Sequence, residues 1–260
     1  MRIKIAILGS TGSIGKSTLE IIKKNKSKFN VELLMAQNNF KALINQAKIF
    51  RAANVLIVNK KYYAKIKKAL STTKTKVFFG NKPVNSIITK KIDYTMSAIV
   101  GIAGLKPTVE AIKCSKKIAI ANKEAIICGW HILSKYIKKY KTEVLPVDSE
   151  HFSIMELSKK LNDNDIEEII LTASGGPFFK TPLTKLKYVK PIQAIKHPNW
   201  KMGKKISVDS ATLMNKVFEV VEAQKIFNID INKFKILIHP KSYVHAIIKF
   251  NNGLTKILIH

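Results

Sequence analysis

Short apolar runs alternate with longer amphipathic segments over the first 145 residues of the chain. Segments 14–26 and 40–50 place apolar side chains at helical spacing, and a third helical pattern runs from Lys123 to about Lys139. The intervening apolar runs predict β-strands at residues 3–8, 31–36, 55–58, 77–79, 94–100 and 117–120. Strands that alternate with helices are typical of an α/β fold with a parallel sheet and crossover helices. We therefore expect one α/β domain over residues 1–145.

The pattern changes after Pro146. A strand is predicted at 166–172, a weakly periodic stretch that contains prolines predicts a loop at 178–202, and a helix is predicted at 211–227. Three further strands are predicted in succession, at 235–239, 244–250 and 254–259. This order indicates a second, α+β domain over residues 146–260.

Composition places the chain among globular proteins with a very basic surface. Lys and Arg number 46 against 17 Asp and Glu, which gives a formal net charge of +29, and 46% of the residues are hydrophobic. Only Arg2 and Arg51 are arginines and the Lys-Lys pairs are dispersed, which favours solvated lysine-rich faces over a nucleic-acid surface. Binding of small anions is compatible with both interpretations. With two cysteines and no apolar stretch near the ~20 residues of a membrane helix, we expect a cytoplasmic protein without a disulfide framework or membrane span.

A glycine-rich turn follows the first predicted strand and opens the first predicted helix. Gly9, Gly12 and Gly15 have the spacing G-x-x-G-x-x-G, a variant of the dinucleotide-binding fingerprint. Glycines allow positive φ and close backbone approach, and the N–H groups that begin the helix can bind a pyrophosphate. The turn could also be purely structural, but its place between strand and helix favours nucleotide binding by a Rossmann-like domain.

The end of the second predicted strand bears on which nicotinamide cofactor binds. The sequence there is Gln37, Asn38 and Asn39, with no carboxylate to bind a ribose 2′-OH or to repel a 2′-phosphate. NADP is therefore permitted, and Lys41 is the nearest cation.

Carboxylates in the second half of the chain form two candidate sites. Asp148 and Glu150 follow a strand at a spacing that lets both converge on one hard cation, although such pairs are often solvated surface. Asn215 and Glu219 share one face of the predicted helix, with Lys216 adjacent. An amide, an ammonium and a carboxylate suit a phosphate and metal site, and an ordinary polar face is the alternative.

Several smaller features complete the candidates. Gly175 and Gly176 follow a strand and predict an anion-binding nest, and His197 with Trp200 in a loop bounded by prolines suggests a lid. We expect the N-cap of the helix at 211–227 to be one of Ser207, Asp209 and Ser210. Two further histidines in or beside strands are expected to be structural: His239 and His245.

Taken together, these motifs resemble the 1-deoxy-D-xylulose 5-phosphate reductoisomerase family. The resemblance runs in order over essentially the whole chain, at residues 9–15, 121–124, 146–151, 174–178, 197–203, 205–212, 214–216, 219 and 237–242. It implies NADPH-dependent and metal-dependent conversion of 1-deoxy-D-xylulose 5-phosphate to 2-C-methyl-D-erythritol 4-phosphate in isoprenoid synthesis. It also implies a homodimer and a small sugar phosphate as the substrate.

The resemblance assigns roles residue by residue. It implies cofactor contacts from Thr11, Gly12, Ser13, Ile14, Asn38, Asn39, Asn122, Glu124 and Gly203. It implies Mg²⁺ or Mn²⁺ ligands at Asp148, Glu150 and Glu219. It implies substrate contacts from Lys123, Ser149, Glu150, Ser174, His197, Ser210, Asn215, Lys216 and Glu219, with Lys123, Glu150 and His197 catalytic. Trp200 and Met202 would be lid residues.

Two departures from the family pattern define the alternatives. The lysine expected to meet the 2′-phosphate is missing at residues 37–39, and Lys41 could take its place. Family members also continue beyond residue 260 into a C-terminal helical domain, so we expect a chain truncated relative to the family. The alternatives to an active enzyme are a non-catalytic remnant that binds only cofactor and a basic nucleic-acid-binding module.

Overall fold

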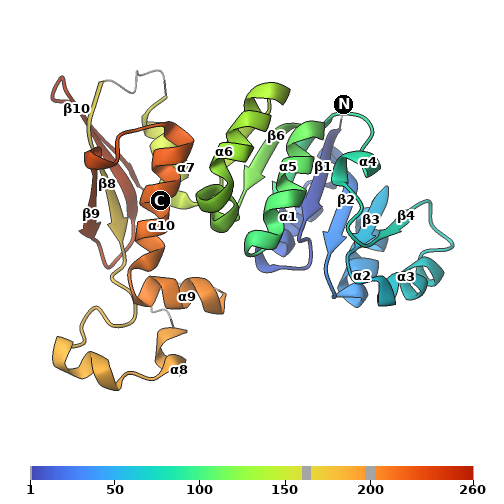
Figure 1. Ribbon diagram of the computed structural model, residues 1–260, viewed down its shortest axis with the longest axis horizontal. Coiled ribbons are helices and arrows are strands. Elements are labelled where there is room, and N and C mark those ends of the chain that lie inside the picture. Colours follow the sequence, from blue (N-terminus) through green and yellow to red (C-terminus); the bar gives the residue numbers. More distant parts are fainter. Residues whose placement is uncertain (1, 160–164, 197–202, 260) are drawn as a thin grey trace. The chain divides into compact units, whose positions relative to one another are not determined.

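The computed structural model describes residues 2–159, 165–196 and 203–259 (Figure 1). The chain divides into two compact units, Met1–Leu145 and Pro146–His260. Each unit has its own sheet and its own buried apolar cluster, so each is described by itself.

Unit 1 is built on a seven-stranded sheet. Its strand order is β4-β3-β2-β1-β5-β6-β7. β1 pairs in parallel with β2 and with β5, and the pairs β2–β3, β3–β4 and β5–β6 are also parallel. The strands are β1 (Ile3–Leu8), β2 (Phe29–Ala36), β3 (Asn54–Ile57), β4 (Lys76–Phe79), β5 (Ile92–Ser97), β6 (Ser115–Ile120) and β7 (Glu143–Pro146). The order reverses between β1 and β5, and ligands of doubly wound sheets bind at the carboxyl edge of such a switch point.

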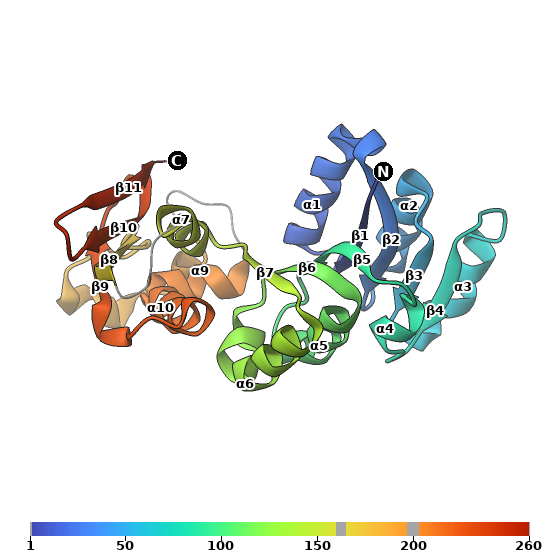
Figure 2. The same ribbon diagram turned by 90° about the horizontal axis from the view of Figure 1, so that it is seen from above.

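Helices cover both faces of this sheet, with α1 and α2 on one side and α5 and α6 on the other (Figure 2). The apolar stripe of α1 packs Leu19 and Ile22 against β1 and β2, together with Leu43 of α2 and Ile66 of α3. The helices are α1 (Ser13–Lys24), α2 (Phe40–Phe50), α3 (Tyr63–Ala69), α4 (Val84–Ile87), α5 (Leu105–Cys114) and α6 (Lys123–Tyr140), with 3₁₀ turns at Lys26–Lys28, Lys60–Tyr62 and Ile102–Gly104. The predicted Rossmann-like parallel sheet is confirmed.

Unit 2 contains a four-stranded mixed sheet in the order β11-β10-β8-β9. β10 is antiparallel to β8 and β11, whereas β8 is parallel to β9. The strands are β8 (Ile166–Ala173), β9 (Phe234–Ile238), β10 (Val244–Phe250) and β11 (Thr255–Ile259). α7 (Ser149–Leu157) and α10 (Met214–Phe227) cover one face, where Ile154 and Ala223 pack with Leu171, Ile248 and Phe250. The expected α+β character is confirmed.

The region between β8 and β9 differs from the prediction in two ways. The helix expected at 211–227 begins three residues later, as α10, and a separate helix that was not predicted, α9 (Lys204–Ala211), precedes it, with a break at Leu213, whose φ is +60°. The expected N-caps were therefore wrong: Ser207, Asp209 and Ser210 lie inside α9, and Leu213 takes the N-cap position of α10. The predicted loop contains a 3₁₀ helix (Leu183–Tyr188) and α8 (Pro191–Ala194), since proline is favourable at the first position of a helix. A further 3₁₀ turn at Ile231–Lys233 precedes β9.

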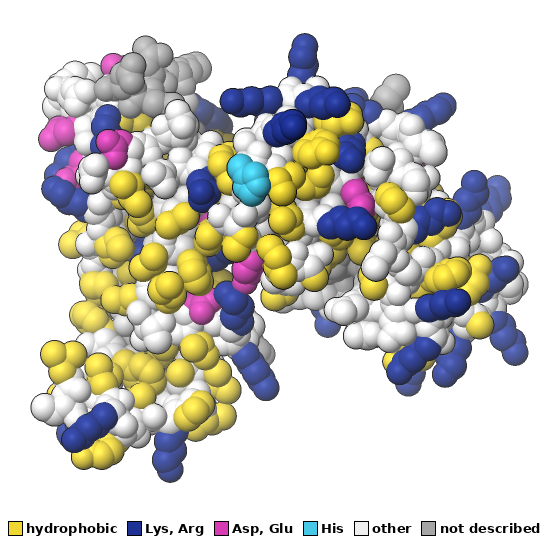
Figure 3. Space-filling model, viewed as in Figure 1, with side chains coloured by type: hydrophobic (Ala, Val, Ile, Leu, Met, Phe, Trp, Pro, Cys, Tyr) yellow, Lys and Arg dark blue, Asp and Glu magenta, His cyan; other side chains and the backbone are white. Residues whose placement is uncertain are grey.

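The remaining general expectations concern cysteine, membrane spans and charge. Cys114 and Cys128 are both free, and burial raises the pKa of the Cys114 thiol to about 11, which makes it unreactive. Within the described ranges, no helix is long and apolar enough to cross a bilayer. On the face drawn in Figure 3, Lys and Arg side chains are dispersed and do not gather in one patch.

Candidate functional site

The glycine-rich turn of unit 1 is shaped by contacts that only glycine permits. The N–H groups of Gly9 and Ser10 donate to the Met35 carbonyl at 3.0 and 2.9 Å, which fixes the turn beside the end of β2. Gly9 has φ +84°, and a Cβ there would lie 2.6 Å from the Ala98 carbonyl oxygen. A Cβ on Gly15 would collide with the backbone of the same turn. The turn therefore holds the start of α1 at the carboxyl edge of the sheet.

A cavity of about 500 Å³ opens at this edge. Thr11 and Gly12 line it from the turn, Gln37 from beyond β2, and Lys82 and Lys106 are its basic side chains. Gly12 is the N-cap of α1 and has no side chain to cap it. The first backbone N–H groups of the helix, from Ser13 onward, therefore receive no side-chain cap. Such an N-terminus suits a pyrophosphate.

Three asparagines expected to contact the cofactor have local structural roles. Asn38 accepts a hydrogen bond from Asn59 at 2.9 Å, and Asn39 caps α2 by accepting from the Ala42 N–H at 3.1 Å. Asn122 caps α6 through the Ala125 N–H and donates to the carbonyls of Ile99 and Gly101. None of the three lines the 500 Å³ cavity, and neither does Lys41. Glu124 lies in the first turn of α6, and Gly203 is the N-cap of α9 in unit 2. Their roles toward a cofactor stay predictions.

In unit 2, a second cavity of about 210 Å³ brings predicted residues from four regions of the chain together. The start of α7, the end of β8, α9 and the first turns of α10 all contribute to its wall. The predicted residues that line it are Asp148, Ser149, Glu150, Ser174, Ser210, Asn215, Lys216 and Glu219. Lys123, which the resemblance implies to be catalytic, is a buried residue of α6 in unit 1. His197, Trp200 and Met202 lie outside the described residues.

A buried ion cluster forms the charged part of this cavity. The Lys216 ammonium lies 2.8 Å from Glu150 Oε1 and 2.5 Å from Glu219 Oε2. Lys216 and Glu219 are only 4% and 3% exposed, so both charges are largely removed from water. Burial alone raises the pKa of Glu150, but His245 and the Lys216 ammonium outweigh it and hold that pKa well below its usual range. For Lys216, burial lowers the pKa, and the charges of Glu219 and Glu150 outweigh it and raise it. Glu150 and Lys216 are therefore both ionised at neutral pH.

His245 is a wall residue that sequence reasoning placed among the structural histidines. Its Nδ1 lies 3.0 Å from Ser149 Oγ, and that hydroxyl donates to Glu150 Oε2 at 2.9 Å. Because the hydroxyl proton goes to the carboxylate, His245 Nδ1 is the donor to Ser149. The local sequence of β10 did not indicate that His245 lines the cavity. His245 reaches it because β10 pairs antiparallel with β8, a strand far away in the sequence.

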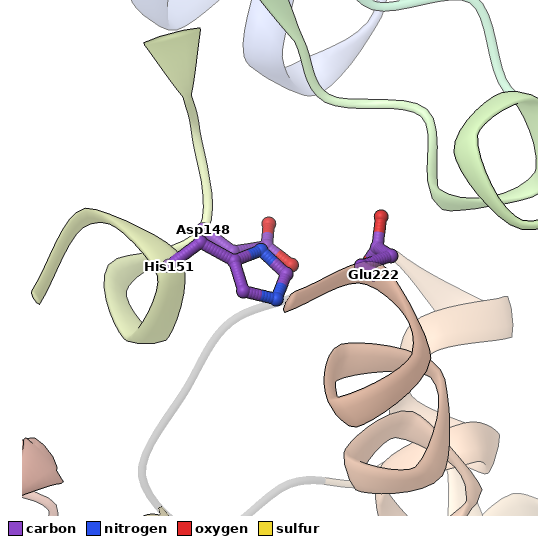
Figure 4. Close-up of side chains that lie close together, drawn as sticks. All are labelled: Asp148, His151 and Glu222. Carbon is purple, nitrogen blue, oxygen red and sulfur yellow. The ribbon is translucent and has the colours of Figure 1, made fainter. Parts of the chain in front are cut away.

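A second group of possible ligands lies around Asp148 (Figure 4). Asp148 and His151 lie side by side at the start of α7, and Glu222 faces them from α10, with ligand atoms within 4.8 Å of one another. His151 Nε2 lies 2.8 Å from the Glu219 carbonyl, which can only accept, so Nε2 carries the proton and Nδ1 has the lone pair in the neutral ring. Sequence reasoning did not select His151 or Glu222.

Comparison with known proteins agrees with the sequence resemblance. A family model described as 1-deoxy-D-xylulose 5-phosphate reductoisomerase matches residues 5–129, and the model of that family's C-terminal domain matches residues 144–227. A protein of that name from Pelagibacter ubique (strain HTCC1062) is 54% identical over 259 residues, which is 99% of this chain and 67% of the relative. This chain belongs to the 1-deoxy-D-xylulose 5-phosphate reductoisomerase family.

Other reductoisomerases agree in sequence and fold. The protein of that name from Wolbachia pipientis wMel is 44% identical, covering 96% of this chain and 64% of the relative. The Zymomonas mobilis reductoisomerase, solved with NADPH, superposes with a TM-score of 0.92 at 37% identity, covering all of this chain and 67% of that one. A reductoisomerase solved with NADPH, fosmidomycin and magnesium has a TM-score of 0.90 at 31% identity, covering 99% and 66%. The chain thus spans about two thirds of the length of these reductoisomerases.

The donor set in unit 2 fits the hard divalent cation expected of a reductoisomerase. Glu150 and Glu219 already converge on one cation, the Lys216 ammonium, and carboxylates are ligands that Mg²⁺ and Mn²⁺ prefer. Asp148 lines the same cavity. Asn215 Nδ2 donates to Glu219 Oε1 at 2.5 Å, while its buried Oδ1 has no hydrogen-bond partner among the described residues. A bound molecule with a donor group would satisfy that oxygen.

Proposed function

We propose that this chain catalyses the NADPH-dependent and metal-dependent isomerisation and reduction of 1-deoxy-D-xylulose 5-phosphate to 2-C-methyl-D-erythritol 4-phosphate. The observation that carries the proposal is the 210 Å³ cavity, which gathers three carboxylates, one ammonium and several hydroxyl and amide groups in one wall. The carboxylates suit a divalent cation, and the remaining groups suit a phosphate.

Asp148, Glu150 and Glu219 would hold Mg²⁺ or Mn²⁺. Bound there, such an ion supplies Lewis-acid stabilisation of negative charge on substrate oxygens during the rearrangement. The low pKa of Glu150 keeps that carboxylate ionised and available as a ligand at neutral pH. The Ser149 hydroxyl, oriented by His245, holds the other Glu150 oxygen and so fixes the direction of the carboxylate.

The phosphate-binding role falls to hydrogen-bond donors that line the same cavity. Ser174 follows β8 directly, where Gly175 and Gly176 have φ +87° and +70° and turn the backbone. Ser210 from α9 and Lys216 from α10 complete the donors. A Cβ on Gly176 would lie 2.7 Å from the Ser210 carbonyl, so the glycine permits the close approach of the Ser174 loop to α9.

In unit 1, the glycine-rich turn supports the NADPH part of the proposal. Its N–H groups at the start of α1 would bind the pyrophosphate, and the 500 Å³ cavity beside it would accept the rest of the dinucleotide. Two of the similar solved reductoisomerases contain NADPH. A homodimer remains the expected assembly by analogy with the family.

An assay of the purified chain tests the proposed reaction. NADPH oxidation is followed with 1-deoxy-D-xylulose 5-phosphate and Mn²⁺, and then with either one omitted. Turnover that requires both components supports the proposal. Tight NADPH binding without turnover would instead indicate a cofactor-binding remnant, and duplex DNA affinity rivalling that for NADPH would indicate a nucleic-acid module.

We expect Lys82→Met to weaken NADPH binding about tenfold and to leave NADH binding within twofold. Lys82 is a cation in the wall of the 500 Å³ cavity, whereas Lys41 is not, so Lys82 is the better candidate to meet the 2′-phosphate. Loss of one charge-assisted contact costs about 1.5 kcal/mol, or roughly tenfold. Fluorescence titration with NADPH and with NADH measures the ratio of the two dissociation constants, with Lys41→Met as the matched control. Equal weakening of NADPH and NADH would refute this role of Lys82.

A further inference from the structure

Unit 1 contains a second large cavity, at the opposite edge of its sheet from the glycine-rich turn. Its volume is about 880 Å³, and its wall includes Lys4, Asn54, Lys76 and Ile92, which stand at or near the starts of β1, β3, β4 and β5. Parallel strands begin at one edge and end at the other, so this cavity lies at the amino edge. It shares no lining residue with the 500 Å³ cavity at the carboxyl edge.

The wall of this amino-edge cavity is rich in positive charge. Six of its 17 lining residues are basic, about twice the share in the whole chain, where 46 of 260 are basic. The six are Lys4, Lys48, Arg51, Lys74, Lys76 and Lys90, and Glu32 is the one acidic residue in the wall. Glu32 lies 3.9 Å from Lys4. The other five form no ion pair with any described residue.

Helix capping accounts for only part of this charge. Lys48 lies in the last turn of α2, and Arg51 is its C-cap, where cations favour the negative end of the helix dipole. Lys74 and Lys76 lie instead at the approach to β4, and Lys90 precedes β5. Lys90 lies two residues beyond Ile88, the C-cap of the one-turn helix α4, whereas Lys74 and Lys76 are not at a helix C-terminus, so the convergence of these lysines on one cavity needs another explanation.

The neutral part of the wall indicates which anions fit. Thr73, Thr75 and Thr89 are among its lining residues, as are the buried Ile88 and Ile92. No aromatic side chain or histidine is among its lining residues, so the cavity offers no platform for stacking of bases. This favours a compact polyanion over a single-stranded nucleic acid.

We propose that the amino-edge cavity binds a small molecule that carries two or more phosphate groups, at a site separate from the dinucleotide site. Five cations without carboxylate partners produce a concentrated positive potential, and a concave wall focuses it. A molecule with several phosphates carries more negative charge and spans a greater length than a single phosphate, so it can meet cations spread over a wide wall. The binding falls as salt rises, since the lysines are exposed to solvent.

Inorganic tripolyphosphate is the probe, measured by calorimetry with NADPH at saturation so that the carboxyl-edge site is filled. The test variant is Lys48→Gln/Lys74→Gln/Lys90→Gln, and the matched control is Lys23→Gln/Lys135→Gln/Lys138→Gln, which removes three exposed lysines elsewhere in unit 1. We expect the dissociation constant to rise at least about tenfold in the test variant, because each exposed charge pair contributes a modest amount, and less than twofold in the control.

Two further measurements keep the result interpretable. NADPH affinity should stay within twofold in both variants, which shows that unit 1 remains folded. The double variant Lys74→Gln/Lys90→Gln, which leaves α2 unchanged, should show a smaller loss in the same direction. Equal losses in the test and control variants, or no saturable binding to the unmodified chain, would overturn the proposal. A selective loss of affinity for a single-stranded oligonucleotide, with tripolyphosphate binding unchanged, would overturn it in favour of a nucleic-acid site.

Discussion

Glu219→Gln is expected to lower kcat/KM of the proposed reductoisomerase reaction by about 10²–10³-fold. The Glu219 carboxylate is 3% exposed, and it and Glu150 both pair with the Lys216 ammonium. Glutamine keeps the size and the hydrogen bond that Asn215 donates to Oε1, but it removes the charge that a hard divalent cation requires. The variant should therefore also need a higher Mn²⁺ concentration for half-maximal rate.

The measurement is a Mn²⁺ titration of initial rate at saturating NADPH. Glu167→Gln, on β8 and exposed, is the matched control for loss of one carboxylate in the same unit. NADPH affinity should not change in either variant, because the glycine-rich turn belongs to unit 1. Unchanged turnover and Mn²⁺ dependence in Glu219→Gln would exclude this carboxylate as a metal ligand.

The fold of unit 1 could be predicted because its sequence signals are local. The change from an apolar strand to a glycine-rich turn and an amphipathic helix lies within residues 3–24, and a Cβ on Gly15 would collide with the backbone of that same turn. Strand boundaries were less accurate, since β2 begins at Phe29, two residues before the apolar run that predicts it. The pairing partner, and not the apolar pattern, decides where a strand starts.

The region around Leu213 shows where local signals fail. Leucine favours helix and carries no signal for a left-handed conformation, yet Leu213 has φ +60° and separates α9 from α10. The break lets Ser210 on one helix and Asn215 on the next line the same cavity. Strain of this kind is typical of functional sites, because the surrounding packing and not the residue itself imposes it.

For the candidate site of unit 2, the sequence predicted the residues that stand in motifs but not all of the residues that lie beside them. Asp148 to Glu150 and Asn215 to Glu219 stand in strings that the sequence displays directly. His245 and Glu222 reach the same region only through tertiary packing, of β10 on β8 and of α10 beside α7. Nothing in the spacing of a strand or helix reports which distant element it will face, so these two residues had no detectable signal.

Lys216→Met is expected to destabilise unit 2 by about 3–5 kcal/mol at neutral pH. Lys216 lies between Glu150 and Glu219 and is 4% exposed, so its removal leaves the buried Glu219 carboxylate and the half-buried Glu150 carboxylate without their shared cation. Methionine retains most of the apolar stem, which separates the loss of charge from the loss of packing. Lys225→Met, on the same helix, is the control and should change the free energy of unfolding by less than about 0.5 kcal/mol.

The pH dependence of this destabilisation identifies its cause. In the unmodified chain the pKa of Glu150 is lowered, so Glu150 contributes stability above its usual pKa of 4.5, and that stability is lost as the pH falls through the lowered value. Without Lys216, the two carboxylates repel each other and their pKa values rise. Protonation then removes this repulsion as the pH falls, and the variant becomes less destabilised. Urea unfolding should show the gap between the two proteins narrowing from pH 7 to pH 5.

Divalent cations, like a lower pH, should narrow the difference in stability between Lys216→Met and the unmodified chain. Because Glu150 and Glu219 converge on one point, Mn²⁺ can replace the missing positive charge and bind the folded state alone. Mn²⁺ should thus raise the free energy of unfolding more in Lys216→Met than in the unmodified chain, and Lys225→Met should behave like the latter. A deficit that is independent of both pH and Mn²⁺ would mean that the loss does not arise from Glu150 and Glu219 being left without a cation, and would contradict a cation site at these carboxylates.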